Sequence, residues 1–252
     1  MKEAEYFFAA LRFFTRLPVP AWVGHSAEQL NHAARWFPAV GLIVGGVGAG
    51  VTLAAALAWP TAIAVLLGMA ATLLVTGAFH EDGLADTIDG LGGGWTRADV
   101  LRIMKDSRIG SYGAIGIGMA LLLKFSALDH LLAVLPAPTF AAVLVAGHAV
   151  SRLASTALIR FLDYAREEGK AKPLATRLGG GELAFAALCG LVPCLWLPAT
   201  QAAVALVLAA LVTVLAARTF AQRLGGYTGD CLGATQQLAE LAFYLGMACA
   251  FS

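Results

Sequence analysis

The sequence predicts an all-α, polytopic integral membrane protein with about seven transmembrane helices. Three observations support this prediction. Of the 252 residues, 59% are apolar, the mean hydropathy is +0.76, and long apolar segments alternate with short polar connections. An average soluble domain contains only about 45–50% apolar residues. A soluble bundle of very apolar helices is the alternative, but such a bundle has no reason to sort its charges along the chain.

Seven apolar segments approach the roughly 20 residues that a helix needs to cross a bilayer. The connections near Pro60, Pro136 and Pro198 are short and contain no Lys or Arg. The first 20 residues do not form a convincing signal peptide, because Arg12 and Arg16 interrupt their apolar part. The predicted spans are residues 37–58, 61–80, 111–134, 139–160, 182–198, 200–217 and 234–251.

The positive charges predict the orientation of these spans. Of the 17 Lys and Arg residues, four precede the first span, four lie in 97–108, five in 160–177 and two in 218–223. All of these fall on one side if the spans alternate, which predicts a cytoplasmic N-terminus and an external C-terminus. We expect one integral membrane catalytic domain over residues 1–252.

Bulk charge and cysteine spacing exclude two further classes of protein. The formal net charge of +1 gives no support for a nucleic-acid partner. The four cysteines contain no CxxC pair, so we expect neither a zinc site nor a disulfide framework.

An acidic stripe within residues 79–113 is the strongest candidate for a functional site. Asp82, Asp86 and Asp89 have the spacing i, i+4, i+7, which places them within roughly 60° on a helix. Neighbouring carboxylates repel one another and raise each other's pKa. Their oxygens, with those of Glu81, suit Mg²⁺ or Mn²⁺. The alternative is an ordinary solvated acidic helix end.

Small and basic residues near this stripe indicate a phosphate ligand. We interpret Gly83 and Gly90 as positions that leave room for a bulky phosphate. A short helix is expected to begin near Thr96, whose hydroxyl can cap it. Basic residues then recur every three positions and predict a cationic edge that faces the stripe and holds a diphosphate. These residues are Arg102, Lys105 and Arg108, with Asp106 and Ser107 between the last two.

Two cations lie inside predicted spans, where charge is costly and often functional. Lys124 is deep, and we expect it to face a cavity as a partner of a phosphate or a carboxylate. Arg152 has His148 one turn deeper, and a snorkelling role and a functional role are equally compatible with its position. Glu240 is expected to line the same cavity.

The last polar connection offers a second group of candidate residues. Thr228 and Asp230 follow a pair of glycines just before an apolar helix, which suggests ligand contact. A plain turn with Asp230 as the helix N-cap is the alternative. We therefore predict active-site loops at 80–112 and 218–234, both on the cytoplasmic side.

Four motifs together resemble the cobalamin synthase family. Two of them lie in the central segment, at His80–Gly90 and Met104–Gly113. The others are Phe14–Pro20, which contains Arg16, and Gly226–Ala234. The resemblance extends from about residue 10 to residue 240.

This resemblance implies a multi-pass enzyme of the bacterial inner membrane that acts late in cobalamin biosynthesis. Such an enzyme transfers the phosphate of adenosylcobinamide-GDP to α-ribazole or its 5′-phosphate, releases GMP and requires Mg²⁺. Asp82, Asp86 and Asp89 would be the catalytic carboxylates, either as metal ligands or with one of them as general base. Asp106 or Asp230 would complete the metal shell. The cations, Arg16 and Thr228 would contact substrate.

Two other functions stay open at the level of sequence. The Asp86-x-x-Asp89-Gly90 core is similar to the CDP-alcohol phosphotransferases, but their Ala-Arg and their later paired aspartates are missing at the expected spacing. A transporter could use Lys124, Arg152 and Glu240 as a relay. Against it, the other carboxylates cluster at one face, and no internal repeat appears. The sequence leaves open whether the protein is a homo-oligomer.

Overall fold

The computed structural model describes residues 2–24, 26–166 and 178–249, and all regular elements among these residues are helical. This agrees with the predicted all-α class. The helices are α1 (Lys2–Phe14), α2 (Ala27–Ala33), η1 (Ala34–Trp36), α3 (Phe37–Ala55), α4 (Thr61–Thr76), α5 (Phe79–Gly93), α6 (Arg97–Ile103), α7 (Ser111–Val134), α8 (Ala137–Phe161), α9 (Gly180–Leu191), η3 (Val192–Trp196), α10 (Ala199–Leu224) and α11 (Gly229–Met247).

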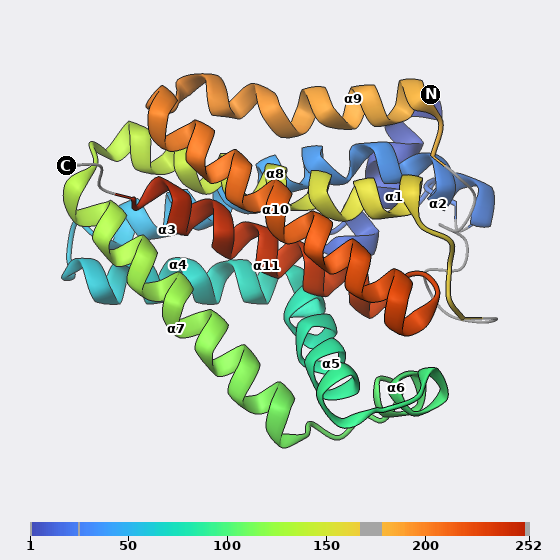
Figure 1. The fold of residues 1–252 in the computed structure, drawn as a ribbon. Helices are drawn as coiled ribbons and strands as arrows, with labels where there is room; N and C mark the ends of the chain where they lie inside the picture. The colour runs from blue at the N-terminus through green and yellow to red at the C-terminus, as the bar shows by residue number, and fades with distance from the viewer. Residues whose placement is uncertain (1, 25, 167–177, 250–252) are drawn as a thin grey trace.

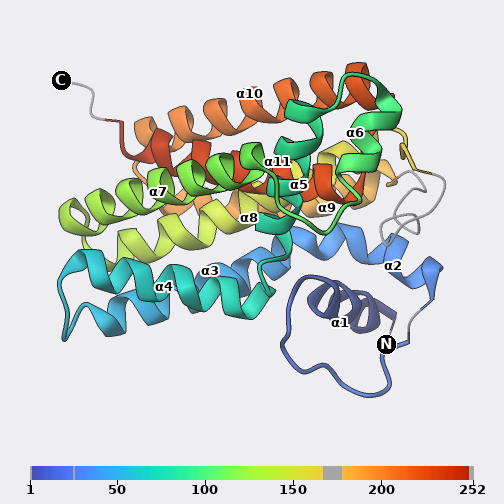
Figure 2. The same cartoon turned by 90° about the horizontal axis from the view of Figure 1, so that it is seen from below.

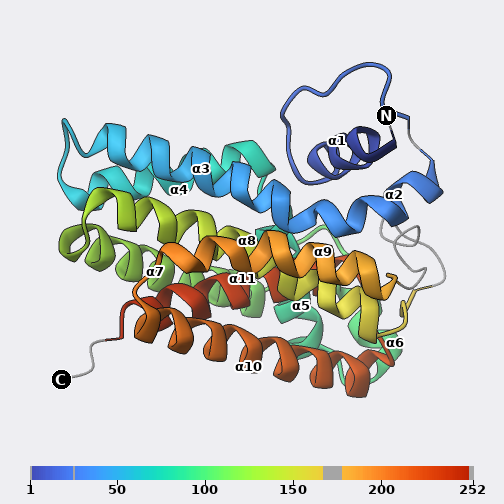
Figure 3. The same cartoon turned by 90° about the horizontal axis from the view of Figure 1, so that it is seen from above.

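The helices α3, α4, α8, α9, α10 and α11 run along a common direction, as the views in Figures 1, 2 and 3 show. Helix α11 occupies the interior, and most of its residues are buried. Helices α3 and α8 pack closely because Gly41 and Gly45 face the backbone of α8. A Cβ atom at Gly45 would lie 2.7 Å from Cα of Val145. Small residues at such contacts are typical of helix packing in membranes.

Four helical segments in the described part of the chain are long and apolar enough to cross a membrane. They are Gln29–Ala55, Ser111–Val134, Ala137–Phe161 and Ala199–Leu224, and α4 adds a fifth only if it is joined to α5 across a bend. These helices support the predicted multi-pass membrane class. The count of seven spans stays a prediction, because α9 is short and α11 carries several buried polar residues.

The ends of the bundle differ in the connections that they carry. The connections without Lys or Arg, at 56–60, 135–136 and 197–198, lie at the same end of the bundle as the end of α11 (Figures 1 and 3). The start of α1 and the segment 94–110, which carries four Lys and Arg residues, lie toward the other end. This arrangement matches the sorting of charges in the sequence. The assignment of that end to the cytoplasm stays a prediction.

The predicted span 61–80 is wrong at its end, since α4 stops at Thr76. Gly77 and Ala78 both adopt left-handed backbone conformations, with φ of 67° and 55°. Only glycine adopts this conformation without steric cost. The chain turns by 88° between α4 and α5. Because of this turn, α5 runs across the bundle and lies outside the four spanning segments (Figure 2).

The segments predicted as active-site loops contain more helix than loop. Residues 80–112 form most of α5 and all of α6, and α10 continues through 218–224 before the chain turns. In that second segment only residues 225–228 connect two helices. At the N-terminal end, the described residues form one more helix, α1, which lies beside α2 at the charged end of the bundle (Figure 3).

Candidate active site

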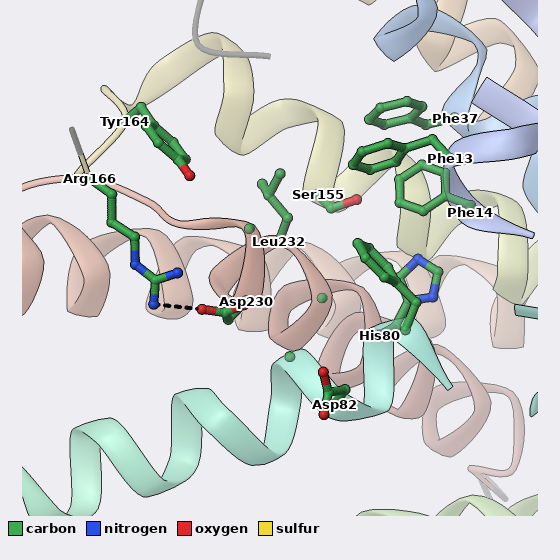
Figure 4. A pocket seen from close by; sticks show the side chains of 14 residues that line it. Phe13, Phe14, Phe37, His80, Asp82, Ser155, Tyr164, Arg166, Asp230 and Leu232 are labelled. Atoms are coloured by element: carbon green, nitrogen blue, oxygen red, sulfur yellow. Dashed lines mark ion pairs between the residues drawn. The ribbon is translucent and has the colours of Figure 1, made fainter. Parts of the chain in front are cut away.

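A cavity of about 310 Å³ lies at the meeting point of α1, α3, α5, α8 and α11. Figure 4 shows its two unlike walls. Asp82, Arg166 and Asp230 form a charged wall, together with Tyr164. Phenylalanine rings from α1, α3 and α5 form the other wall. The cavity therefore places ionised groups and a flat apolar surface within one site.

The charged wall exists because α5 and α11 cross at glycines. A Cβ atom at Gly83 would lie 2.9 Å from the carbonyl oxygen of Asp230, and one at Gly233 would lie 3.1 Å from that of His80. Without side chains at these positions, the helices approach closely enough to bring Asp82 beside Asp230. Gly83 thus allows close helix packing and also lines the cavity, so its interpretation as room for a phosphate stays a prediction. Gly90 likewise packs against Met104 of the next segment.

Arg166 reaches this wall because the chain after α8 pairs with the turn before α11. The N–H of Tyr227 donates to the carbonyl of Asp163 at 2.9 Å, and the N–H of Ala165 donates to Tyr227 at 2.8 Å. Gly226 permits this pairing, because any Cβ there would clash with the carbonyl of Asp163. The guanidinium of Arg166 then forms an ion pair with Asp230, with Nη2 and Oδ2 2.9 Å apart (Figure 4).

Asp86 does not line the cavity, but its carboxylate lies close enough to those of Asp82 and Asp230 for the three to repel one another. Burial, followed by the charges of Asp230 and Asp82, raises the pKa of Asp86 from 3.8 to about 7, although Arg166 opposes the shift. Burial also raises the pKa of Asp230, again against the effect of Arg166. Asp82 is exposed and Asp86 is half-buried. A positively charged ligand would relieve this repulsion.

Asp89, the third residue of the acidic stripe, has a different environment. Its carboxylate oxygens each accept a backbone hydrogen bond at 2.7 Å, one from Gly110 and one from Gly113. These donors belong to the N-cap and the first turn of α7, whose free N–H groups favour an anion. Both positions must be glycine, since a Cβ atom at either would clash with the carboxylate. Asp89 therefore anchors α7 to α5.

Glu81, the fourth predicted metal ligand, is directed toward α11. Its Oε1 accepts a hydrogen bond from Nε2 of Gln237 at 2.8 Å, and its buried Oε2 has no hydrogen-bond partner among the described residues. Glu81 does not line the cavity. Glu81 thus faces α11, whereas Asp89, on the helix face that it shares with Asp82 and Asp86, meets the start of α7.

Four acidic residues of α5 were predicted to hold Mg²⁺: Glu81, Asp82, Asp86 and Asp89. In the described ranges, no three His, Cys, Asp or Glu side chains lie close enough together to hold a metal ion. Two of these predicted ligands, Asp89 and Glu81, already accept hydrogen bonds from other groups of the protein. Asp82, Asp86 and Asp230 retain the donor chemistry that suits a hard divalent cation, and their mutual repulsion is of the kind that such a cation would neutralise.

The predicted cationic edge does not form one helix face, because α6 ends at Ile103. Arg102 forms an ion pair with Asp99 at 3.4 Å, and Arg108 forms one with Asp106 at 2.8 Å. The Thr96 cap is confirmed, as its hydroxyl accepts from the N–H of Asp99 at 3.2 Å. The predicted substrate-binding residues of this segment are exposed and do not line the cavity: Arg102, Lys105, Asp106, Ser107 and Arg108.

Two further predicted contacts have structural roles here. Thr228 is the N-cap of α11, and its hydroxyl accepts from the N–H of Cys231 at 3.3 Å. The alternative of Asp230 as the N-cap is therefore wrong. The backbone N–H of Arg16 donates to the carbonyl of Val75 at 2.7 Å, and its side chain lies over Gly77 at the bend before α5.

The charges predicted inside the membrane form a buried network. Nζ of Lys124 lies 2.5 Å from Oε1 of Glu240, and Nδ1 of His148 lies 3.1 Å from Oε2 of Glu240. Arg152 is 1% exposed and donates to the carbonyl of His148 at 2.9 Å. The network joins α7, α8 and α11. Lys124 therefore faces a carboxylate of the protein, and none of these side chains lines the cavity.

Sequence reasoning missed the residues that complete the cavity. Arg166 stands in a mixed charged run at 166–172, where no local pattern distinguishes it from its neighbours, so it was not predicted as a site residue. Phe13 directly precedes the Phe14–Pro20 motif, and Phe14 is its first residue. This motif was the one available signal in the sequence for α1. Of that charged run, Glu167–Lys172 lies outside the described residues.

The model of the cobalamin-5-phosphate synthase family matches residues 6–248. Adenosylcobinamide-GDP ribazoletransferase from Leptothrix cholodnii is 52% identical over 255 residues, covering 97% of this chain and 95% of the relative. The proteins of that name from Shewanella frigidimarina and Ralstonia pickettii are 47% and 48% identical. They cover 97% and 95% of this chain, and 94% and 93% of their own lengths. No solved structure matches.

Proposed function

This chain belongs to the cobalamin-5-phosphate synthase family, and we propose that the cavity between α1, α5 and α11 performs its reaction. The enzyme is an adenosylcobinamide-GDP ribazoletransferase of cobalamin biosynthesis, in agreement with the names of its relatives. It joins adenosylcobinamide phosphate to ribazole and releases GMP. This activity decides against the transporter and the lipid phosphotransferase that the sequence alone left open.

The reaction exchanges one phosphorus–oxygen bond for another. A hydroxyl oxygen of ribazole attacks the phosphorus that is attached to cobinamide. The bond from this phosphorus to the bridging oxygen of the diphosphate breaks, and GMP leaves with that oxygen. The hydroxyl proton must pass to a base. Because charge accumulates on both the phosphate and the leaving group, stabilisation of charge is the main requirement on the site.

The charged wall of the cavity meets this requirement, and it is the observation that carries the proposal. Arg166 provides a cation that can hold a phosphate oxygen, once the phosphate competes with its partner Asp230. Two of the three carboxylates of Asp82, Asp86 and Asp230, together with oxygens of the diphosphate, would hold Mg²⁺, or Mn²⁺ in its place. The metal would neutralise the diphosphate. The carboxylate that does not hold metal is available as the base for the ribazole hydroxyl.

In our proposal, Asp89 and Glu81 position the helices that form this site. Asp89 holds the start of α7 against α5, and Glu81 holds α5 against Gln237 of α11. The exposed cations of α6 and the following turn, including Lys105 and Arg108, are placed to attract an anionic donor before it enters the cavity. We propose that this face is cytoplasmic and that the protein lies in the bacterial inner membrane.

The decisive experiment combines purified protein with adenosylcobinamide-GDP, α-ribazole and Mg²⁺ and measures GMP and cobalamin together. Both products should appear in equal amounts, and EDTA should abolish both. Addition of Mg²⁺ or Mn²⁺ should restore them. Release of GMP without a cobalamin would mean that the donor is hydrolysed and that ribazole is not the acceptor. An Arg166→Gln variant should reduce the rate by roughly 100-fold if Arg166 stabilises the developing charge.

A further inference from the structure

The charged wall is assembled from three parts of the fold that are distant in sequence. Helix α5 carries Asp82, helix α11 carries Asp230, and the segment after α8 carries Arg166 (Figure 4). We define the strap as residues 163–166. Glycines allow α5 to meet α11, and backbone hydrogen bonds with Tyr227 join the strap to the turn before α11. A contact between the strap and the α5 side of the wall would complete the set.

Arg97 provides this third contact. It is the first residue of α6, and its Nη2 donates a hydrogen bond to the carbonyl of Ala165 at 2.8 Å. This carbonyl belongs to the planar peptide unit that leads into Arg166. The N–H of Ala165 also donates, to the carbonyl of Tyr227 at 2.8 Å. Both backbone polar groups of Ala165 are therefore held, one from α6 and one from the turn before α11.

Helix α6 can hold the strap because it packs firmly against α5. Val100 and Met104 are buried, and Gly90 and Gly94, near the end of α5, leave room for them. A Cβ atom at Gly94 would lie 2.6 Å from the backbone nitrogen of Val100. Through this packing, the position of α5 determines the position of Arg97 and hence that of the strap.

The contacts of Arg97 differ from those of the other arginines in its segment. Arg102 and Arg108 each form an ion pair with a neighbouring aspartate. In the described part of the chain, Arg97 forms no ion pair, and its guanidinium donates to Ala165 instead. A hydrogen bond from a charged donor is stronger than one between neutral groups. Arg97 is therefore suited to fixing the backbone of the strap.

This inference rests on the proposed function, in which Arg166 holds a phosphate oxygen and the carboxylates hold the metal. Both groups must meet the same phosphate, and a displacement of about 1 Å can cost about 100-fold in rate. We propose that Arg97 is a positioning residue of the reaction, which acts through the carbonyl of Ala165 to hold Arg166 in place opposite the carboxylates of α5. Arg97 does not line the cavity.

Hydrogen exchange of the purified full-length protein in detergent tests this contact independently of activity. Arg97→Ala should raise the exchange rates of the Ala165 and Tyr227 amides, which pair the strap with the turn before α11, by about fivefold. Arg12→Ala is the matched control, because Arg12 likewise donates to a backbone carbonyl, that of Val23 at 3.0 Å, in the segment after α1. Unchanged exchange in Arg97→Ala, or an equal increase in the control, would overturn the proposal.

Steady-state kinetics with adenosylcobinamide-GDP and α-ribazole test the consequence for the reaction. Arg97→Ala should lower kcat about tenfold and leave the KM for α-ribazole within about twofold, because Arg166 is displaced from the phosphate. Arg97→Lys keeps a charged donor and should recover part of the loss, and Arg12→Ala should retain kcat within about twofold. A higher KM for adenosylcobinamide-GDP at unchanged kcat would mean that Arg97 only attracts the anionic donor, and the positioning role would be wrong.

The same substitution in the background of Arg166→Gln separates positioning from a general structural role. If Arg97 acts through Arg166, adding Arg97→Ala to Arg166→Gln should lower kcat by less than about twofold. A general structural role would lower kcat by the same factor in both backgrounds, and that result would refute the proposal. If the parent forms no cobalamin, the proposed function itself fails, whereas hydrogen exchange still tests the contact between Arg97 and the strap.

Discussion

Replacement of Asp89 by alanine should destabilise the protein strongly, because this residue anchors α7. The carboxylate accepts two backbone hydrogen bonds of 2.7 Å, from Gly110 and Gly113, and is 8% exposed. Hydrogen bonds to a charged acceptor contribute about 1.5–3 kcal/mol each, so Asp89→Ala should cost roughly 3–6 kcal/mol. In a chain of this size, that corresponds to a decrease in Tm of roughly 6–24 °C.

Thermal unfolding of the purified variants in detergent measures this effect. Asp89→Asn keeps one carbonyl oxygen and should fall between Asp89→Ala and the parent. Asp82→Asn serves as the stability control, because Asp82 is exposed and lies on the same helix face. If Asp89→Ala unfolds at the parental Tm but has no turnover, Asp89 acts directly in catalysis and the anchoring role is wrong.

Four further predictions follow from the charges and the connections of the bundle. Burial and neighbouring carboxylates raise the pKa of Asp86 to about 7. The apparent dissociation constant for Mg²⁺ should therefore rise up to about tenfold for each pH unit below 7 and level off above pH 7. A binding titration in which this constant does not change with pH would contradict the prediction. The same raised pKa means that ionisation of Asp86 favours unfolding, so the metal-free protein should lose stability as pH rises from about 4 to about 7. Glu240→Leu should lower the free energy of unfolding by about 3–5 kcal/mol, because it leaves Lys124 buried without its partner. In thermal unfolding, the double variant that adds Lys124→Leu should recover most of that loss. A double variant as unstable as the single one would refute the pairing of Lys124 with Glu240. Cysteines placed at Gly93 and Ala137 in a background without native cysteines should be labelled from the cytoplasm and from outside, respectively, and the reverse pattern would invert the topology.

The features that depend on local sequence were predicted well. Apolar composition and segment length predicted a helical membrane protein, and the spacing of Asp82, Asp86 and Asp89 predicted one helix face. The Thr96 cap was also correct, since capping depends on residues three positions apart. In each case the interacting groups are close in the chain.

The features that were missed depend on contacts between distant segments. The carboxylates of the stripe differ in role because Asp89 meets α7 and Asp86 meets the start of α11, which helical spacing does not reveal. Lys124 was correctly expected to face a charge, but the partner is Glu240, more than 100 positions away in the chain. Arg166 enters the site only through the backbone pairing at Tyr227.

Glycines were recognised in the sequence, but their packing roles were not predicted. Gly83 was interpreted as room for a ligand, and it also allows α5 to cross α11. The bend at Gly77 was missed because the apolar pattern of 61–80 continues through it without a proline. A missing side chain serves access, packing or backbone conformation equally well, and only the three-dimensional neighbours distinguish among them.

The most direct test of the account is the rate of coupled GMP and cobalamin formation by Asp86→Asn, compared with the parent and expressed per folded molecule. An amide is a poor ligand for Mg²⁺ and cannot act as a base, so the rate should fall by at least roughly 100-fold. The metal-free variant should unfold at the parental Tm or slightly above it, because one repelling charge is removed. A variant that retains parental turnover would show that the transfer does not take place at this carboxylate wall.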